Sequence, residues 1–319
     1  MAASREYQSQ VEAEDGTNIA WRVSISESTE VPLLVICNGL SNDDAQWYQY
    51  FNAWRGKYSF VYWDYAGHGL SSPAAKPRDL SIEGCARYLQ LVLERVQIET
   101  TVSVASFVLV GYSIGAQVAL EYCHSRKVGR PNVLGVVILL GCTERPLGRI
   151  LRSDTLGCAA VSLLTSMPRP IIKAMLCAPL MLPSLSFWLM CTLGLGEEGV
   201  GFPTALAYAE HLAKLDPDSF VYLLAAAQKH STVGRTGAMM TAVERTSRLP
   251  ALVISASKDL MAPPVHLQNL KTAFPDATVV HLPNGSHMAL AGHADEIIQN
   301  VENFIDRHIV NGSHCCAPQ

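Results

Sequence analysis

Residues 106–122 read SFVLVGYSIGAQVALEY, and this stretch decides the fold. Its apolar beginning is typical of a buried strand, and the residues from 116 onward are typical of a helix. Ser113 stands at the junction between Gly111 and Gly115, which is the pattern of a tight turn that exposes a nucleophilic serine. The following helix aims backbone N–H groups at the same point, where they can stabilise negative charge. A serine that only caps the helix is the alternative, and the flanking strand and helix favour the nucleophile.

Two later loops carry side chains that would activate such a serine. Residues 252–256 are typical of a buried strand, and Asp259 stands in the loop that follows. Residues 277–282 form another strand-like run, and His287 stands in the loop after it. A neutral His287 can accept the Ser113 proton, while an ionised Asp259 orients the imidazole and stabilises its charged form.

Strands and helices alternate along the chain, which predicts an α/β fold with a doubly wound, mostly parallel sheet. Such sheets hold their sites at the carboxyl ends of the strands, where Asp259 and His287 are expected. Glu144 also follows a predicted strand and is the alternative acid. After a hairpin at 5–24, strands are predicted at 31–37, 58–64, 106–112, 133–140, 250–256 and 277–282, and helices at 80–98, 114–126 and 292–309.

Two motifs in the N-terminal part complete a family pattern. Residues 38–40 read NGL directly after a predicted strand, and residues 64–71 read DYAGHGLS after the next one. With the order Ser…Asp…His, they make the chain resemble the α/β-hydrolase superfamily, in particular its serine esterases and lipases with a helical cap. The resemblance covers residues 5–142 and 249–310.

The resemblance implies an oxyanion hole and a division of the chain. The backbone N–H groups of Leu40 and Ile114 would form the hole, and the family's usual histidine is replaced by Asn38, which leaves the backbone donor available. The implied parts are an α/β-hydrolase core at 1–142 and 249–310, a helical cap at 143–248 and a flexible tail at 311–319.

The resemblance also implies an activity, namely cleavage of a carboxylic ester through an acyl-enzyme without cofactor or metal. Thioester, carbon–carbon and perhydrolysis chemistry use the same triad and stay open as alternatives. A ligand-binding or receptor module with little turnover is another, because a fold does not fix a function. Epoxide hydrolases and dehalogenases of the family carry Asp where this chain has Ser113, which disfavours them.

Residues 174–196 contain no charged residue. A stretch of this length can span a bilayer, but its two prolines argue against one continuous helix. We expect short apolar helices of the cap, with Met181, Phe187 and Trp188 lining a pocket for an apolar small-molecule ester. Ordinary packing within the cap is the alternative, and peripheral contact between the cap and a membrane stays open.

Composition narrows the class of partner. The net charge of −4 argues against nucleic-acid binding, because proteins that bind nucleic acid usually carry an excess of Lys and Arg. Charged residues make up 16% of the chain, against about 25% in typical proteins, so the chain is unusually apolar. Its 9 cysteines are odd in number and show no zinc-binding spacing, and the N-terminus is too polar for a secretory signal. These features predict reduced thiols and a cytoplasmic protein.

Overall fold

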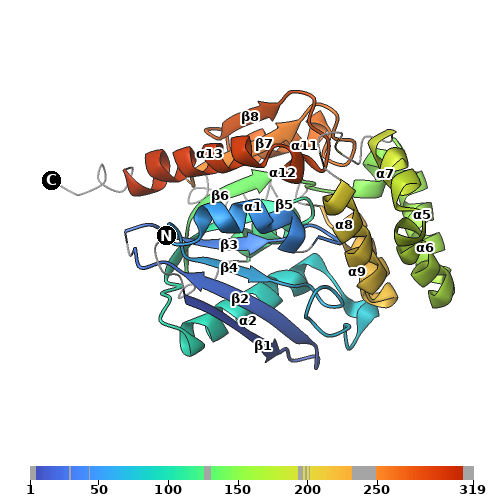
Figure 1. Cartoon of the computed structure of the whole chain (residues 1–319), viewed down its shortest axis with the longest axis horizontal. Coiled ribbons are helices and arrows are strands. Elements are labelled where there is room, and N and C mark those ends of the chain that lie inside the picture. The colour runs from blue at the N-terminus through green and yellow to red at the C-terminus, as the bar shows by residue number, and fades with distance from the viewer. Residues whose placement is uncertain are drawn as a thin grey trace.

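The computed structural model describes residues 5–28, 30–42, 44–125, 131–192, 197, 200, 202–231 and 249–311. These residues form an eight-stranded sheet with the order β1-β2-β4-β3-β5-β6-β7-β8 and with helices on both faces (Figure 1). The strands are β1 (Arg5–Glu12), β2 (Asn18–Ile25), β3 (Leu33–Cys37), β4 (Phe60–Trp63), β5 (Ser106–Tyr112), β6 (Asn132–Leu139), β7 (Ala251–Ala256) and β8 (Thr278–Leu282).

The sheet is parallel except at its N-terminal edge. Strands β1 and β2 form the predicted hairpin, and β2 pairs antiparallel with β4. The other neighbours, from β4 to β8, pair parallel. The predicted doubly wound α/β fold is therefore confirmed, and each predicted strand lies within two residues of an observed one.

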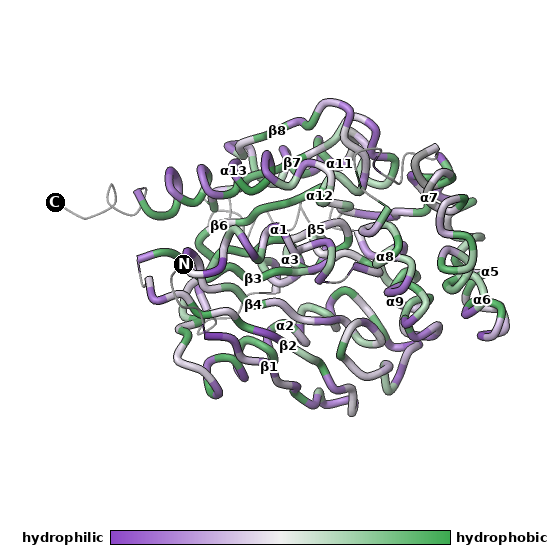
Figure 2. The backbone as a smooth tube through the Cα atoms, in the orientation of Figure 1, coloured by the Kyte–Doolittle hydropathy of each residue, from purple (hydrophilic) through white to green (hydrophobic). Residues whose placement is uncertain are grey.

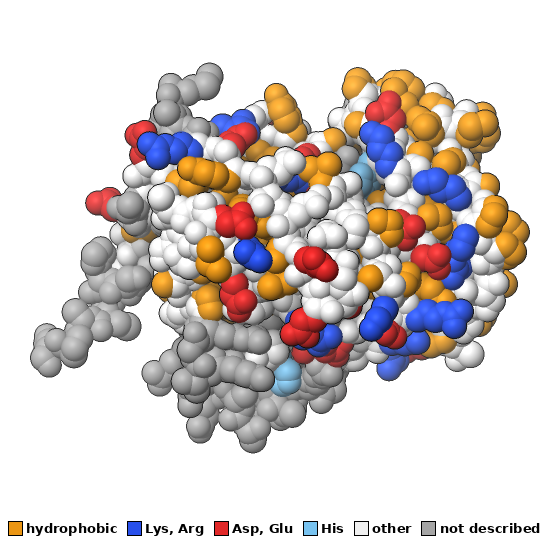
Figure 3. All heavy atoms as spheres, turned by 90° about the horizontal axis from the view of Figure 1, so that it is seen from below, with side chains coloured by type: hydrophobic (Ala, Val, Ile, Leu, Met, Phe, Trp, Pro, Cys, Tyr) orange, Lys and Arg blue, Asp and Glu red, His pale blue; other side chains and the backbone are white. Residues whose placement is uncertain are grey.

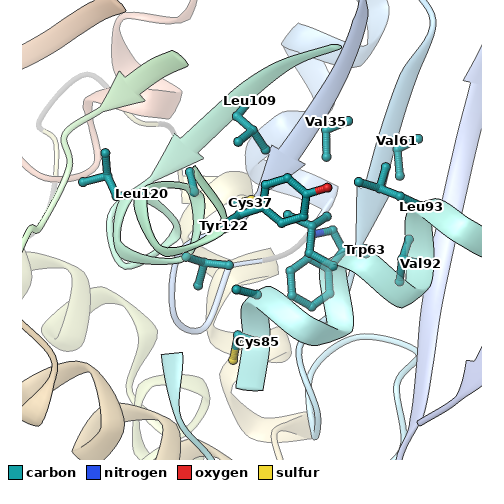
Figure 4. Packing of buried hydrophobic residues seen from close by; sticks show 14 of the residues in the cluster. Val35, Cys37, Val61, Trp63, Cys85, Val92, Leu93, Leu109, Leu120 and Tyr122 are labelled. Carbon is teal, nitrogen blue, oxygen red and sulfur yellow. The ribbon is translucent and has the colours of Figure 1, made fainter. Parts of the chain in front are cut away.

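Both faces of the central strands are buried, which is why these strands read as continuous apolar runs. All 5 residues of β3 are buried. Val35 and Cys37 pack with Tyr122 against helices α2 (Ile82–Glu99) and α3 (Gly115–His124), and Figure 4 shows this cluster. Figure 2 shows hydrophobic residues concentrated along the central strands.

The opposite face of the sheet is covered by helices from both ends of the chain. Leu34 and Ile36 point to this face and pack with α1 (Asp44–Trp54) and α13 (Ala294–Phe304). The predicted closing helix is divided here, because α12 (Ala289–Gly292) precedes α13 and a π-helical turn follows it. Helix α11 (Pro264–Ala273) lies where no helix is predicted, since its double proline is typical of a loop.

The chain between β6 and β7 forms a separate group of helices, which we call the inserted helices. They are α4 (Pro146–Ile150), α5 (Asp154–Ser166), α6 (Arg169–Met181), α7 (Pro183–Thr192), α8 (Phe202–Lys214) and α9 (Pro217–Lys229). No helix within the described parts of the chain combines the length and the apolar character that crossing a membrane requires. The predicted tail lies outside the described residues except for Asn311.

The inserted helices lie beyond one end of the sheet, at the right in Figure 1. Tyr208 in α8 hydrogen-bonds through its hydroxyl to the Ser41 hydroxyl at 3.0 Å, and Ser41 belongs to the loop after β3. The Asp216 amide donates to the Gly67 carbonyl at 3.1 Å, and Gly67 belongs to the loop after β4. The inserted helices therefore contact the loops that leave the carboxyl ends of the strands.

Gly115 is the tightest point of the fold. A Cβ at this position would lie 2.0 Å from the Cys37 carbonyl oxygen, which is backbone and cannot rotate away. We expect Gly115→Ala to lower the free energy of unfolding by about 3 kcal/mol or more, because such overpacking forces the backbone to shift. Urea unfolding measures this loss.

Gly84→Ala is the matched control, since the atoms nearest its added Cβ belong to the Ser81 and Arg87 side chains, at 3.1 and 3.6 Å. This change should alter stability by less than about 1 kcal/mol, because alanine favours the helix. Equal losses in the two variants would contradict the proposed role of Gly115.

Candidate active site

Ser113, His287 and Asp259 form a continuous hydrogen-bonded row. His287 Nε2 lies 2.9 Å from Ser113 Oγ, and His287 Nδ1 lies 2.9 Å from Asp259 Oδ2. In the tautomer with hydrogen on Nδ1, His287 donates to the carboxylate and accepts from the serine hydroxyl. All three side chains are buried. The structure thus brings together the three residues that the sequence pattern selects.

The turn after β5 gives Ser113 its position. The φ angle of Ser113 is +53°, a strained value for a residue with a side chain. A Cβ at Gly111 would lie 2.7 Å from the Gly115 carbonyl oxygen, so the strand and the helix meet too closely for larger residues. Hydrogen bonds also join the Ser113 amide to the Leu139 carbonyl and the Cys142 amide to the Ser113 carbonyl, each at 3.1 Å. This bracing against β6 holds the strained residue in place.

Asp259 is held by the backbone of its own loop. Its Oδ1 accepts hydrogen bonds from the amides of Met261 and Ala262, at 2.8 and 2.9 Å. The other oxygen is thereby directed to His287. Glu144, the alternative acid, instead accepts from Arg149 Nη2 and from the Ser231 hydroxyl, each at 2.9 Å. The geometry therefore favours Asp259 as the partner of the histidine.

The loop that carries His287 is anchored on β5. The Tyr112 hydroxyl donates to the His287 carbonyl at 2.8 Å, and the two rings stack with their centroids 5.6 Å apart. Because Tyr112 directly precedes Ser113, one strand end positions both the serine and the imidazole.

The loop of residues 38–40 lies against the serine. A Cβ at Gly39 would be 3.2 Å from Ser113 Cβ. Within the described residues, neither the Leu40 amide nor the Ile114 amide donates a hydrogen bond to another group. Two such amides beside a serine can receive the oxygen of a reacting carbonyl.

Asn38 fixes this loop through four hydrogen bonds of its side chain. Its Oδ1 accepts from the Gly39 amide and from Trp47 Nε1, both at 2.9 Å. Its Nδ2 donates to the Asn42 carbonyl at 3.0 Å and to the Tyr62 hydroxyl at 2.6 Å. Asparagine therefore supplies both donors and acceptors in a buried network, where a missing partner would be costly.

Three buried histidines of the structure stay neutral near neutral pH. His68 and His211 lie with their rings 6.5 Å apart, between the loop after β4 and helix α8. Burial lowers the pKa of each to about 4. His266 bonds through Nδ1 to the Thr143 hydroxyl at 2.5 Å, and burial lowers its pKa to about 4 as well. Near neutral pH these rings add no charge around His287.

The three residues expected to line the substrate pocket lie on α6 and α7. The Met181 side chain is 77% exposed and that of Trp188 is 63% exposed. The side chain of Phe187 lies outside the described parts of the structure. The pocket wall thus stays a prediction, and what is observed for Met181 and Trp188 is an exposed apolar surface.

A cluster with metal-binding chemistry joins the inserted helices to the core. Ligand atoms of Glu83, Glu121 and His230 lie within 4.8 Å of one another. The His230 ring also lies 3.5 Å from the Glu83 carboxylate and 3.8 Å from that of Glu121, so a protonated ring would form two ion pairs. This cluster lies where α2, α3 and the end of α9 meet, and it includes none of the residues Ser113, His287 and Asp259.

Two residues beside the site have no distinct signal in the sequence. Glu197 accepts two hydrogen bonds from Ser286, the residue before His287. The Tyr208 hydroxyl bonds to Ser41, next to the loop of residues 38–40. Both belong to the chain between β6 and β7, which we call the inserted segment. This segment lies far from the motifs in the sequence, and only folding brings the two residues to these loops.

Comparisons with known proteins agree with this geometry. The model of the alpha/beta hydrolase family matches residues 34–300. An uncharacterized protein of Mycobacterium tuberculosis (strain ATCC 25618 / H37Rv) is 22% identical over 284 residues, which are 86% of this chain and 75% of the relative.

Two solved structures share the fold at low sequence identity. The esterase RhEst1 from Rhodococcus sp. ECU1013 is 19% identical, with a TM-score of 0.65 over 96% of this chain and 99% of the esterase. A bromoperoxidase from Bacillus anthracis is 17% identical, with a TM-score of 0.67 over 93% of this chain and 100% of that protein. The family match spans the serine, the acid and the histidine, and the chain is therefore a hydrolase of the alpha/beta hydrolase family.

Proposed function

We propose that the protein is a serine hydrolase that cleaves carboxylic esters with an apolar acyl or alkyl group. The observation that carries this proposal is the row Asp259–His287–Ser113, with both hydrogen bonds at 2.9 Å. A serine, a base and an orienting acid in this geometry are the parts that acyl transfer requires. The likeness to an esterase supports the choice of ester over other acyl compounds.

The mechanism follows from the geometry. His287 Nε2 takes the Ser113 proton as Oγ attacks the acyl carbon, and the Leu40 and Ile114 amides bind the resulting oxyanion. His287 then protonates the departing alcohol, which leaves an acyl-enzyme on Ser113. Water loses a proton to His287, attacks the acyl carbon and releases the acid. Ionised Asp259 stabilises the imidazolium in both halves of the reaction.

Thiol chemistry does not compete at this site. Cys142 lies beside the serine turn, but burial raises the pKa of its thiol to about 12, so the thiolate is scarce at neutral pH. The six cysteines whose side chains the structure describes are free thiols. We propose a cytoplasmic location, where reduced thiols are the rule. Thioester and carbon–carbon cleavage and perhydrolysis use the same serine and are separated from esterolysis only by substrate.

We further propose that the inserted helices are the cap of the core, and that the outer face of α5, α6 and α7 rests on a phospholipid membrane. Of the exposed large hydrophobic side chains in the described structure, most lie on this face: Leu156, Leu163, Ile171, Met175, Leu180, Met181, Leu182, Leu185, Trp188 and Leu189. Hydrophobic side chains gather along the right edge of the molecule in Figure 3, where these helices lie.

The charges of this face fit a lipid surface. Residues 155–192 contain no Asp or Glu, and their two basic side chains bond inside the protein, Arg169 to Asp218 and Lys173 to the Ala213 and Leu215 carbonyls. Lipid phosphates repel carboxylates, which this stretch lacks, while exposed tryptophan and aliphatic groups enter the interface. A membrane would also concentrate the apolar ester near the cap.

The role of Ser113 is tested with an alanine variant. Ser113→Ala should abolish covalent labelling by a fluorophosphonate and lower hydrolysis of nitrophenyl esters by at least about 10³-fold, as loss of a triad serine does. Wild-type activity in purified Ser113→Ala would refute the mechanism.

The apolar pocket is tested with nitrophenyl esters of increasing acyl length. Wild-type kcat/KM should rise roughly fourfold per added methylene from acetyl to medium chains, because each buried methylene contributes about 0.8 kcal/mol. A flat chain-length profile would refute the apolar pocket.

The role of Asp259 is tested against the alternative acid. Asp259→Asn keeps the shape of the side chain but favours the wrong tautomer of His287, so kcat should fall by about 10⁴-fold. Glu144→Gln should lower kcat by less than about tenfold, since Glu144 bonds to Arg149 and Ser231 and not to the imidazole. If Glu144→Gln lowered kcat strongly and Asp259→Asn lowered it only slightly, Glu144 would be the acid and the assignment of Asp259 would be wrong.

The membrane contact is tested by flotation with vesicles of phosphatidylcholine and phosphatidylserine. The wild-type protein should float with the vesicles, and Met181→Glu/Trp188→Glu should stay in the dense fraction, because burying two carboxylates in the interface is unfavourable. Ile98→Glu is the control, since Ile98 is 72% exposed on α2, outside the proposed face. A wild-type protein that does not float, or one that pairs through this face in solution, speaks against the proposal.

A further inference from the structure

A carboxylate from the inserted segment is bonded to the residue before His287. Glu197 Oε2 accepts a hydrogen bond from the Ser286 amide at 2.8 Å and another from the Ser286 hydroxyl at 2.7 Å. Both side chains are buried. An ionised acceptor that is buried with two donors forms strong, directional bonds.

The surrounding chain makes room for this carboxylate. A Cβ at Gly292 would lie 2.3 Å from Glu197 Cγ, so a larger residue would push Glu197 away. His293 Nε2 lies 3.7 Å from Glu197 Oε1, on the side away from the Ser286 bonds. The turn before α13 therefore holds Glu197 in a fitted position.

The contact fixes the chain on both sides of the histidine. The Ser286 hydroxyl donates to Glu197 and accepts from the Met288 amide at 3.1 Å. Ser286 thus bonds to the carboxylate directly, and Met288 is linked to it through the Ser286 hydroxyl. The Tyr112 hydroxyl holds the His287 carbonyl from the side of the sheet, at 2.8 Å.

The other anchors of this loop come from the core. The Ser257 hydroxyl accepts from the Asn284 amide, and the Lys258 amide donates to the Gly285 carbonyl, each at 2.8 Å. They hold the beginning of the loop, whereas Glu197 holds its end. Among these anchors Glu197 alone belongs to the inserted segment.

We propose that Glu197 is a positioning residue, which couples the docking of the inserted segment on the core to the orientation of the His287 imidazole. This inference rests on the proposed serine hydrolase function. The two bonds cross from this segment to the loop of His287, so without Glu197 in place Ser286 loses its acceptor and the end of the loop is released. In this proposal the inserted segment helps to orient His287, the general base.

The test compares Glu197→Ala with Glu197→Gln in the full chain. A displacement of the imidazole by about 1 Å lowers the rate by about 10²-fold, so Glu197→Ala should lower kcat by about ten- to a hundredfold with little change in KM. Glu197→Gln should recover most of this loss, because the amide oxygen still accepts from Ser286. Glu210→Ala, on an exposed position of α8, is the control and should leave kcat unchanged. Fluorophosphonate labelling of Ser113 should slow by the same factor as kcat.

A second measurement does not depend on activity. Hydrogen–deuterium exchange of the peptide that contains residues 283–290 should become faster in Glu197→Ala and remain slow in Glu197→Gln and Glu210→Ala. If the wild-type protein hydrolyses no ester, the proposed function fails, and this exchange result still decides whether Glu197 holds the loop. Unchanged exchange and kcat in Glu197→Ala would overturn the inference. A loss of thermal stability and kcat that Glu197→Gln fails to recover would also overturn it, since it would assign Glu197 to stability alone.

Discussion

The close approach of helix α3 to the end of strand β3 is the constraint on which the rest of the site depends. Gly115 meets the Cys37 carbonyl so closely that no side chain fits between them. This approach forces Ser113 into its strained conformation and brings the first amides of the helix beside residues 38–40. The positions of the proposed nucleophile and of the proposed oxyanion donors thus depend on one close contact, which the buried sheet keeps in place.

The histidine depends on a different kind of interaction. Its loop has little regular structure, so directional hydrogen bonds must replace packing as the source of precision. Asp259 and Tyr112 supply these bonds from the core, and Glu197 supplies one set from the inserted segment. The rings of His68, His211 and His266 stay neutral near neutral pH, because burial lowers their pKa values.

The sequence predicts the sheet, the inserted helices and the row of three residues, because each of these leaves a local pattern. Apolar runs mark the strands, two glycines mark the turn at Ser113, and polar loops after strands mark Asp259 and His287. The contact between Glu197 and Ser286 leaves no such pattern, since it joins loops far apart in the chain through a single side chain. The exposure of Met181 and Trp188 is equally hidden, because an apolar helix reads the same whether its outer face meets a pocket, a neighbour or a membrane.

Asn38 gives the loop of residues 38–40 a property that an imidazole would not. An amide side chain has no titratable proton, so its Oδ1 always accepts and its Nδ2 always donates. The bonds to Trp47 and Tyr62 therefore keep the same polarity at every pH at which the protein is folded. A histidine would exchange an acceptor for a donor on protonation and could invert part of the network. In this chain, acidification therefore leaves the donors and acceptors of the Asn38 side chain unchanged.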